Sequence, residues 1–217
     1  MLNRGVFISL EGIEGSGKST QARILSDYMS GLGYCVVQTR EPGGTPVAEK
    51  IREVLLDPTN SSMTGMTELL LYLAARSQHV EQLIIPSLQK GKVVICERFS
   101  DSTRAYQGFA RGLDMDMIEE LIQIATCSLE PDLTIVLDME VKEGLLRAER
   151  FKNYRDRLES ENLDFHNKVR NGYLEIAKKN PNRVKIISAE GSVEDIHLRI
   201  RQYVNDKFFN NYTDKPN

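Results

Sequence analysis

The feature that most constrains this chain is one glycine-rich run with the spacing G-x-x-x-x-G-K-[ST]. It reads Gly12-Ile13-Glu14-Gly15-Ser16-Gly17-Lys18-Ser19, and it directly follows the apolar run Val6–Leu10. Glycines allow backbone angles that larger residues avoid, so successive N–H groups can converge on phosphate oxygens at the start of a helix. In such a loop the lysine reaches the β- and γ-phosphates and the serine hydroxyl binds Mg²⁺. The segment Gly12 to Thr20 is therefore predicted to bind a nucleoside triphosphate, with Lys18 and Ser19 as its key side chains.

Length and composition favour one globular α/β domain spanning residues 1–217. The chain has 41% hydrophobic and 27% charged residues, and no apolar stretch long enough to cross a bilayer. Its formal net charge is −3, and it contains no lysine- or arginine-rich block of the kind that binds nucleic acid. We therefore expect a cytoplasmic protein that binds neither membranes nor nucleic acid.

The cysteines are odd in number and widely spaced, at Cys35, Cys96 and Cys127. Each lies in an apolar segment, so we expect buried thiols rather than disulfides or a metal site.

Strand-like and helix-like segments alternate along the chain. Five runs are rich in β-branched residues and nearly continuous in apolar character: Val6–Leu10, Cys35–Thr39, Val93–Cys96, Leu133–Leu137 and Val184–Ile187. The helical patterns between them are Ala22, Leu25, Met29 and Leu32; Val47, Ile51, Val54 and Leu55; Leu69–Ala75; Met117, Leu121 and Ile124; Phe165, Val169 and Tyr173; and Ile196, Ile200 and Val204. This alternation predicts a parallel sheet, buried on both faces, between layers of helices. Ligands of such folds bind beyond the carboxyl ends of the strands.

Two further polar motifs follow predicted strands and should open on the same edge of the sheet. The first is Thr39-Arg40-Glu41-Pro42-Gly43-Gly44-Thr45, and the second is Glu97-Arg98-Phe99-Ser100-Asp101-Ser102-Thr103. The guanidinium of Arg98 suits bidentate binding of a phosphate, and Glu97 is a candidate ligand of Mg²⁺, directly or through water. The alternative is that these two side chains form a surface ion pair with each other.

Three segments depart from the strand and helix pattern. Residues 57–65 are predicted to form a polar loop between helices. Residues 147–159 carry Arg147, Arg150, Lys152, Arg155 and Arg157 with few apolar residues. Such a segment is either a solvated helix face or, beside a triphosphate-binding loop, a lid over residues 144–159 whose arginines close over the transferred phosphoryl group. We favour the lid. Residues 210–217 are polar and are predicted to form a frayed tail.

Together these motifs resemble those of the thymidylate kinase family, over residues 5–208. The segments that carry the resemblance are Gly12 to Thr20; Arg40-Glu41-Pro42-Gly43-Gly44-Thr45-Pro46; Glu97 to Thr103 with Tyr106-Gln107-Gly108; Pro131-Asp132-Leu133-Thr134; and Asp156-Arg157-Leu158-Glu159. The resemblance implies transfer of the ATP γ-phosphate to dTMP, with Mg²⁺ as cofactor. It also implies a three-layer fold of the P-loop NTPase type, with a five-stranded parallel sheet, a helical lid and a homodimer built from helices.

The same resemblance implies a set of dTMP-binding residues. Arg98 would bind the monophosphate, and Tyr72 and Arg76 would stack on and read the thymine base; on its apolar spacing alone, Tyr72 would be a core residue. Tyr106 would crowd the 2′ carbon of the sugar. The remaining implied contacts are Glu14, Glu41, Pro42, Thr103 and Gln107.

Glu14 also bears on catalysis, because family members without an arginine in the glycine loop carry arginines in the lid. Arg150 and Arg155 are the main candidates, followed by Arg147 and Lys152. Two positions differ from the family pattern: Glu97 replaces an aspartate, which changes the reach of the expected metal ligand, and Ala75 replaces an acid that would orient Arg76.

Two other activities are alternatives to this one. A deoxynucleoside kinase acting on thymidine has a similar Glu-Arg-Ser stretch, and there Glu97 would be the base that takes the proton of the hydroxyl. A monophosphate acceptor needs no such base, so catalysis would come from alignment and charge stabilisation. A nucleotide-driven switch or motor is disfavoured because the chain has no Asn-Lys-x-Asp motif.

Overall fold

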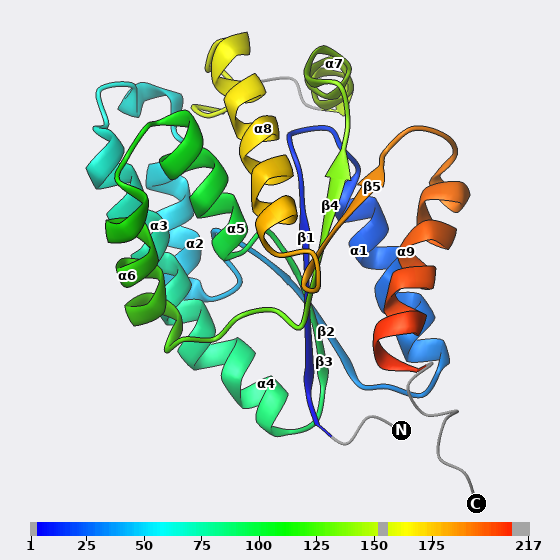
Figure 1. Ribbon diagram of the computed structural model, residues 1–217. Helices are drawn as coiled ribbons and strands as arrows, with labels where there is room; N and C mark the ends of the chain where they lie inside the picture. The colour runs from blue at the N-terminus through cyan, green and yellow to red at the C-terminus, as the bar shows by residue number, and fades with distance from the viewer. Residues whose placement is uncertain (1–3, 152–155, 210–217) are drawn as a thin grey trace, which may run out of the picture.

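A parallel sheet of five strands forms the centre of the molecule (Figure 1). The computed structural model describes residues 4–151 and 156–209. The strands are β1 Val6–Glu11, β2 Val36–Arg40, β3 Val93–Glu97, β4 Leu133–Asp138 and β5 Val184–Ser188, in the order β2-β3-β1-β4-β5. The five predicted strand runs are thus confirmed, and so is the α/β class.

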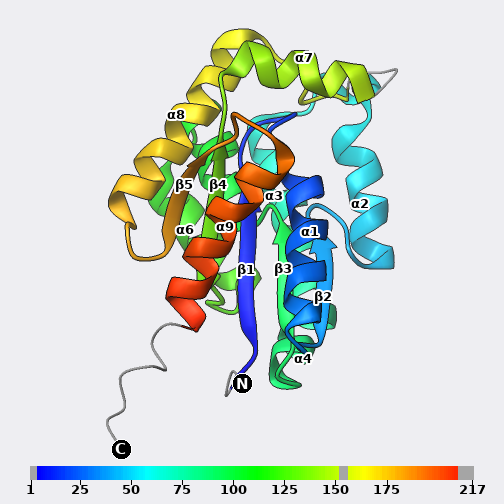
Figure 2. The same cartoon turned by 90° about the vertical axis from the view of Figure 1, so that its right-hand side faces the viewer.

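Helices cover both faces of this sheet and give it three layers (Figures 1 and 2). One face carries α1 Lys18–Gly31 and α9 Val193–Phe208. The other carries α2 Pro46–Leu56, α3 Gly65–His79, α4 Ile85–Gln89, α5 Ser100–Thr103, α6 Met115–Thr126 and α8 Leu163–Lys179. A 3₁₀ turn, Pro58–Asn60, lies in the predicted polar loop, and π-helical segments span Val80–Ile84 and Arg104–Ala110. The helix α7, Val141–Phe151, crosses above the carboxyl ends of the strands, in the predicted lid region (Figure 2).

The three central strands are buried on both faces, but the two edge strands are not. Every residue of β1 is buried, whereas β2 has no fully buried residue and Ile186 of β5 is 38% exposed. The prediction that all five strands are buried on both faces is therefore wrong for β2 and β5. An apolar run indicates that a strand packs against other elements. Whether the strand lies at the centre or at the edge of the sheet depends on strand order, and the run itself does not reveal that order.

Helix α6 forms where predicted, and two residues of its predicted apolar stripe, Met117 and Leu121, pack partly buried against the core cluster beside α3. The stripe is wrong at Ile124 and misses the buried Ile118 and Ile122. Ile124 is 75% exposed. Because the helix is apolar on two adjacent faces, periodicity alone could not decide which face meets the core.

The cysteines also differ from the expectation. All three are free, as predicted, but only Cys96 is buried, while Cys35 and Cys127 are exposed. Cys35 precedes the edge strand β2, and Cys127 ends α6 in the left-handed region with φ of 52°. Both lie at the boundary of an element, where apolar neighbours in sequence do not guarantee burial. Among the described helices, none is long and apolar enough to span a membrane.

Side chains cap the N-termini of several helices, but no side chain caps the N-terminus of α1. Thr45 caps α2, Asp114 caps α6 and Asn162 caps α8 by accepting backbone N–H groups. By contrast, α1 begins after Gly17, whose φ is 93°, with no side-chain cap. The first N–H groups of α1 therefore point into the glycine loop without a side-chain acceptor, as a phosphate-binding helix start requires.

Candidate active site

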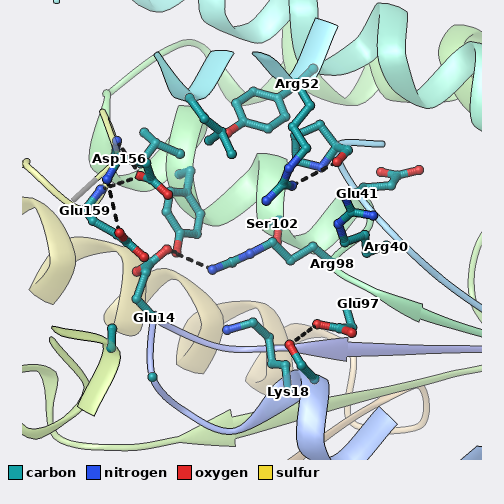
Figure 3. A pocket seen from close by; sticks show the side chains of 18 of the residues that line it. Glu14, Lys18, Arg40, Glu41, Arg52, Glu97, Arg98, Ser102, Asp156 and Glu159 are labelled. Atoms are coloured by element: carbon teal, nitrogen blue, oxygen red, sulfur yellow. Dashed lines mark hydrogen bonds and ion pairs between the residues drawn. The ribbon is translucent and has the colours of Figure 1, made fainter. Parts of the chain in front are cut away.

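A cavity of about 530 Å³ opens at the carboxyl edge of the sheet (Figure 3). It brings together the glycine loop, the segment after β2, helix α3, the segment after β3, and residues on either side of the gap between α7 and α8. Most of the predicted site residues line it: Glu14, Gly15, Gly17, Lys18, Ser19, Thr20, Glu41, Pro42, Tyr72, Glu97, Arg98, Thr103, Tyr106 and Gln107. Three motifs that are far apart in the sequence thus share one cavity.

A few predicted residues lie elsewhere. Within the glycine loop, Gly12, Ile13 and Ser16 form its inner side, and Ile13 is only 3% exposed. Arg76 is buried beneath the cavity wall. On α7, Arg150 is exposed and Arg147 pairs with Glu143. Lys152 and Arg155 lie outside the described residues.

The glycine loop holds Lys18 in a buried position that disfavours its charged form. Its ammonium group donates hydrogen bonds to the carbonyl of Ile13 at 2.6 Å and to that of Gly12 at 3.1 Å. Burial, followed by the nearby charge of Arg98, lowers the pKa of Lys18 to about 7. The loop also leaves no room at Gly15, where a Cβ would lie 1.9 Å from the carbonyl oxygen of Gly144 in α7. A phosphate bound here would place a negative charge beside Lys18 and so favour its protonated, charged form.

Ser19 and Glu97 meet between the start of α1 and the end of β3. The Ser19 hydroxyl donates to Oε2 of Glu97 at 2.6 Å. Two hard oxygen groups side by side at a phosphate-binding loop match the donors that Mg²⁺ prefers. Glu97 therefore faces Ser19. Within the described residues it forms no ion pair with Arg98, so the alternative interpretation is wrong.

Arg98 pairs with Glu14 instead. Its guanidinium donates to Oε1 of Glu14 at 2.8 Å and to the carbonyl of Gly12 at 3.1 Å, and it lies 5.0 Å from the ring centroid of Tyr106. Burial alone would raise the pKa of Glu14, but Arg98, His166, Lys18 and Tyr106 together outweigh burial, with Arg98 the largest of the four, and hold this pKa well below its usual range. Tyr106 donates to the same carboxylate oxygen at 2.6 Å. The arginine is thus positioned, charged and turned toward the cavity (Figure 3).

Arg76 has an orienting acid although Ala75 is not one. Its Nε donates to Oε2 of Glu41 at 2.7 Å, and its terminal nitrogens donate to Thr103 at 2.8 Å and to the carbonyl of Phe99 at 3.0 Å. His79 contacts the other oxygen of Glu41 at 2.9 Å. Burial opposes ionisation, but Arg76 and His79 lower the pKa of Glu41 below its usual value. The expectation that Arg76 lacks an orienting acid is therefore wrong, because the acid comes from a different segment of the chain.

Helix α3 and the end of the lid region form the far wall of the cavity. Glu68 accepts from Gln107 at 2.8 Å and from Arg157 at 2.6 Å. Arg157 also donates to the carbonyl of Leu55 at 2.9 Å, which ties the segment after the lid to α2. Tyr72 lines the cavity and also packs, partly buried, against the main core, so its core packing is confirmed while its stacking on a base stays a prediction.

Some lining residues carried no site assignment at the level of sequence. Arg52 lines the cavity and donates to the carbonyl of Pro42 at 2.9 Å, and burial lowers its pKa. The others are Arg40, Leu56, Ser102, Ala148, Asp156, Leu158 and Glu159. Several of these stand within quoted motifs, whereas Arg52 sits in an ordinary amphipathic helix, so only the packing of α2 beside the cavity reveals it.

The fold and the site define a class: an α/β nucleotide phosphotransferase with a P-loop at the carboxyl end of the first strand. The family model described as "Thymidylate kinase" matches residues 10–200. The chain belongs to the thymidylate kinase family, whose members are phosphotransferases acting on dTMP.

Relatives agree with this assignment. Thymidylate kinase of Syntrophotalea carbinolica is 50% identical over 200 residues, covering 89% of this chain and 92% of the relative. That of Pelobacter propionicus is 49% identical over 212 residues, covering 95% and 97%. A crystal structure of thymidylate kinase from Ehrlichia chaffeensis has a TM-score of 0.76 and 34% identity, covering 93% of this chain and 99% of that one. The predicted family, fold and enzyme class are confirmed.

The depressed pKa of Lys18 predicts a pH dependence of stability. Between pH about 7 and 10.5 the unfolded chain binds a proton that folded Lys18 has lost, so Lys18 makes the free energy of unfolding rise with pH in this window. Relative to Lys18→Met, the wild type should gain roughly 1–3 kcal/mol between pH 7 and pH 10. Urea unfolding at several pH values measures this.

Lys142→Met serves as the control, because Lys142 is exposed on α7. Its stability difference from the wild type should not change with pH. Parallel pH profiles for the wild type and Lys18→Met would contradict the prediction.

Proposed function

We propose that this chain transfers the γ-phosphoryl group of ATP to dTMP in this cavity, yielding dTDP and ADP for dTTP biosynthesis. The observation that carries the proposal is that the triphosphate-binding loop and Arg98 line one cavity together with Tyr72 and Gln107. Both nucleotides can therefore be bound with their phosphates facing each other.

Electrostatics is the main difficulty of this reaction. Two like charges 4 Å apart at an effective dielectric constant of 20 repel by about 4 kcal/mol, and the acceptor is a dianion approaching a polyanion. Lys18, Arg98, Arg40 and Arg52 line the cavity and supply counter-charge. We infer that the acceptor phosphate replaces Glu14 as the partner of Arg98, and that no general base is needed.

The expected cofactor fits the residues at the metal position. Ser19 and Glu97 would hold Mg²⁺, since both present oxygens at the phosphate loop. When bound, the ion would neutralise charge developing on the β- and γ-phosphate oxygens. Glu97 is longer than the aspartate common in the family, and its contact with Ser19 supports its placement at this position.

The remaining roles follow the positions of the side chains. Tyr72 would stack on thymine, and Tyr106 would crowd the 2′ carbon of the sugar and favour a deoxyribose. Gln107 and Thr103 line the cavity where they can contact the base edge, and Arg76 holds Thr103 from beneath. Because Arg76 is 2% exposed beneath the cavity wall, it would act on the base through Thr103 rather than by direct contact with a pyrimidine carbonyl. Glu41 and Pro42 would form the wall opposite the glycine loop.

The lid arginines remain a proposal. Helix α7 begins against the glycine loop, where Gly144 approaches the carbonyl of Glu14 so closely that a Cβ there would lie 2.6 Å away. Arg150, further along α7, and Arg155, outside the described residues, would complete the charge stabilisation of the transferred group. Arg147 and Lys152 rank behind them.

We also propose a cytoplasmic location and a homodimer. The free cysteines, two of them exposed, fit a reducing compartment. Helices α2, α3 and α6, which form one side of the molecule in Figure 1, expose large apolar side chains. These are Val47, Val54, Met66, Leu70 and Ile124. Such exposure is typical of a surface covered by a second copy.

An acceptor panel tests the function. With ATP and Mg²⁺, we expect phosphorylation of dTMP and little or none of thymidine, which lacks the phosphate that Arg98 would bind, or of CMP, AMP and GMP, whose 2′-hydroxyl would meet Tyr106. A coupled assay of ADP release measures this. Activity on thymidine without activity on dTMP would reject the proposal in favour of a deoxynucleoside kinase.

Two substitutions test the assigned cations. Lys18→Ala and Arg98→Ala should each reduce turnover by at least about 100-fold, because each removes a counter-charge from the phosphates. Arg199→Ala is the matched control, since Arg199 is an exposed arginine on α9 that contacts backbone carbonyls of Ser188 and Glu190. Near-normal turnover of either variant, with an intact circular dichroism spectrum, would refute the assignment.

The dimer is tested by adding charge to the exposed apolar face. Leu70→Glu should give a monomer by light scattering coupled to size-exclusion chromatography, because a carboxylate in the interface would lose its solvation. Leu198→Glu is the control, since Leu198 is 59% exposed on α9 in the opposite layer. A monomeric wild type, or dimers of both variants, would contradict the proposal.

A further inference from the structure

Glu11 is a fully buried carboxylate that none of the roles above uses. It ends β1 directly before the glycine loop and is 0% exposed. Oε1 accepts the backbone N–H of Phe99 at 2.7 Å, and Oε2 accepts the hydroxyls of Ser102 at 2.6 Å and Tyr173 at 2.9 Å. These donors come from the turn after β3, from α5 and from α8, so one side chain links three separate elements.

All of these contacts surround Arg98. Its φ is 66°, in the left-handed region that costs a non-glycine residue about 1–2 kcal/mol. The backbone N–H of Arg98 donates to the carbonyl of Leu10 at 2.9 Å, and the backbone N–H of Phe99 donates to the carboxylate of Glu11. The backbone of Arg98 is thus held on both sides by β1, which maintains the unfavourable angle.

The guanidinium is held through the same carboxylate. Its NH1 donates to Ser102 at 3.4 Å and to Tyr173 at 3.3 Å. Because both hydroxyls give their protons to Glu11, their lone pairs are left facing the arginine. Glu11 therefore determines both the backbone and the side-chain placement of Arg98 without touching the guanidinium.

Glu11, Ser102 and Tyr173 form a cluster of oxygens that has one proton too few for all of its hydrogen bonds when Glu11 is ionised. Ser102 and Tyr173 also contact each other at 2.8 Å, so three oxygens form a closed triangle with Oε2 of Glu11. Three contacts need three protons, and the two hydroxyls supply only two. The third is present when Glu11 itself carries a proton.

The surroundings of Glu11 make both its ionised and its protonated form accessible near neutral pH. Burial, and after it the carboxylate of Asp101, raises the pKa of Glu11 to about 7, against the lowering effects of Ser102, Arg98 and Phe99. Tyr173, Lys18 and Cys96 also face it, from α8, α1 and β3. A second negative charge near Arg98 would shift this balance toward the protonated form.

We propose that Glu11 is the positioning residue for Arg98 and that it takes up one proton from solvent when the acceptor phosphate binds against Arg98. The proton joins Oε2, no covalent bond of the substrate changes, and the buried site loses one negative charge as it gains the dianion. This inference rests on the proposed function, in which Arg98 binds the monophosphate.

Calorimetric titration with dTMP measures the proton directly. It is run at pH 8 in two buffers of different ionisation enthalpy, where the nucleotide phosphate, with a second pKa of about 6, is already a dianion. The wild type should take up a fraction of a proton per dTMP bound, and Glu11→Gln should take up less. Any uptake that remains in Glu11→Gln comes from other groups, so the difference between the two proteins is the share of Glu11. Equal uptake by the two proteins would overturn the proposal.

Kinetics tests the positioning role separately. Glu11→Gln should raise the KM for dTMP about tenfold or more while the KM for ATP changes less than about twofold, because only the Arg98 side of the cavity is disturbed. Asp132→Asn is the matched control, since Asp132 accepts the N–H of Phe7 at 2.9 Å near the opposite end of β1. It should lower stability and leave both KM values unchanged. An unchanged KM for dTMP in folded Glu11→Gln would overturn the proposal.

Tyr173→Phe covers the case in which Glu11→Gln does not fold. It removes one hydroxyl of the triangle and keeps the ring, so we expect a several-fold increase in the KM for dTMP and altered proton uptake. A wild-type KM and wild-type uptake in this variant would also overturn the proposal. Phosphorylation of dTMP by the wild type, assayed in parallel, separates the two claims: its absence refutes the function, and its presence without these effects refutes only the role of Glu11.

Discussion

The ion pair between Arg98 and Glu14 is the interaction on which the site depends. A cavity that binds two anionic nucleotides must gather cations, and gathered cations repel one another. Burial first, and then the charge of Arg98, lowers the pKa of Lys18. Glu14 supplies the compensating charge from within the glycine loop, 2.8 Å from the guanidinium. A buried charge without a partner is strongly unfavourable, so this pairing stabilises the folded site.

Three more buried carboxylates organise the segments around this pair. Glu41 orients Arg76, Glu68 binds Arg157, and Glu11 binds the turn that carries Arg98. Each accepts hydrogen bonds from a segment distant in sequence. The loops beyond the strands have few apolar side chains to bury, so satisfied polar contacts hold them in place where hydrophobic packing holds the sheet.

Parts of the fold and site were accessible from local patterns. The glycine loop, the five strands and the Glu97-Arg98 motif each have a short-range signature, and each was found where predicted. The fully buried positions of α6, the exposure of Cys35 and the half-exposed edge strands were not, because they depend on what packs beside each element. Arg52 carries no local signal either: its spacing is that of any helical arginine.

The sequence by itself determined the chemistry and the order of the elements, because glycine spacing, β-branched runs and capping residues act over a few residues. Only the tertiary structure decided which charges meet. Strand order brings the ends of β1 and β3 together, so that Glu11 lies beneath Arg98 and Glu14 lies beside it. Pairing of buried charges depends on distances across the fold, and these exist only after the sheet has formed.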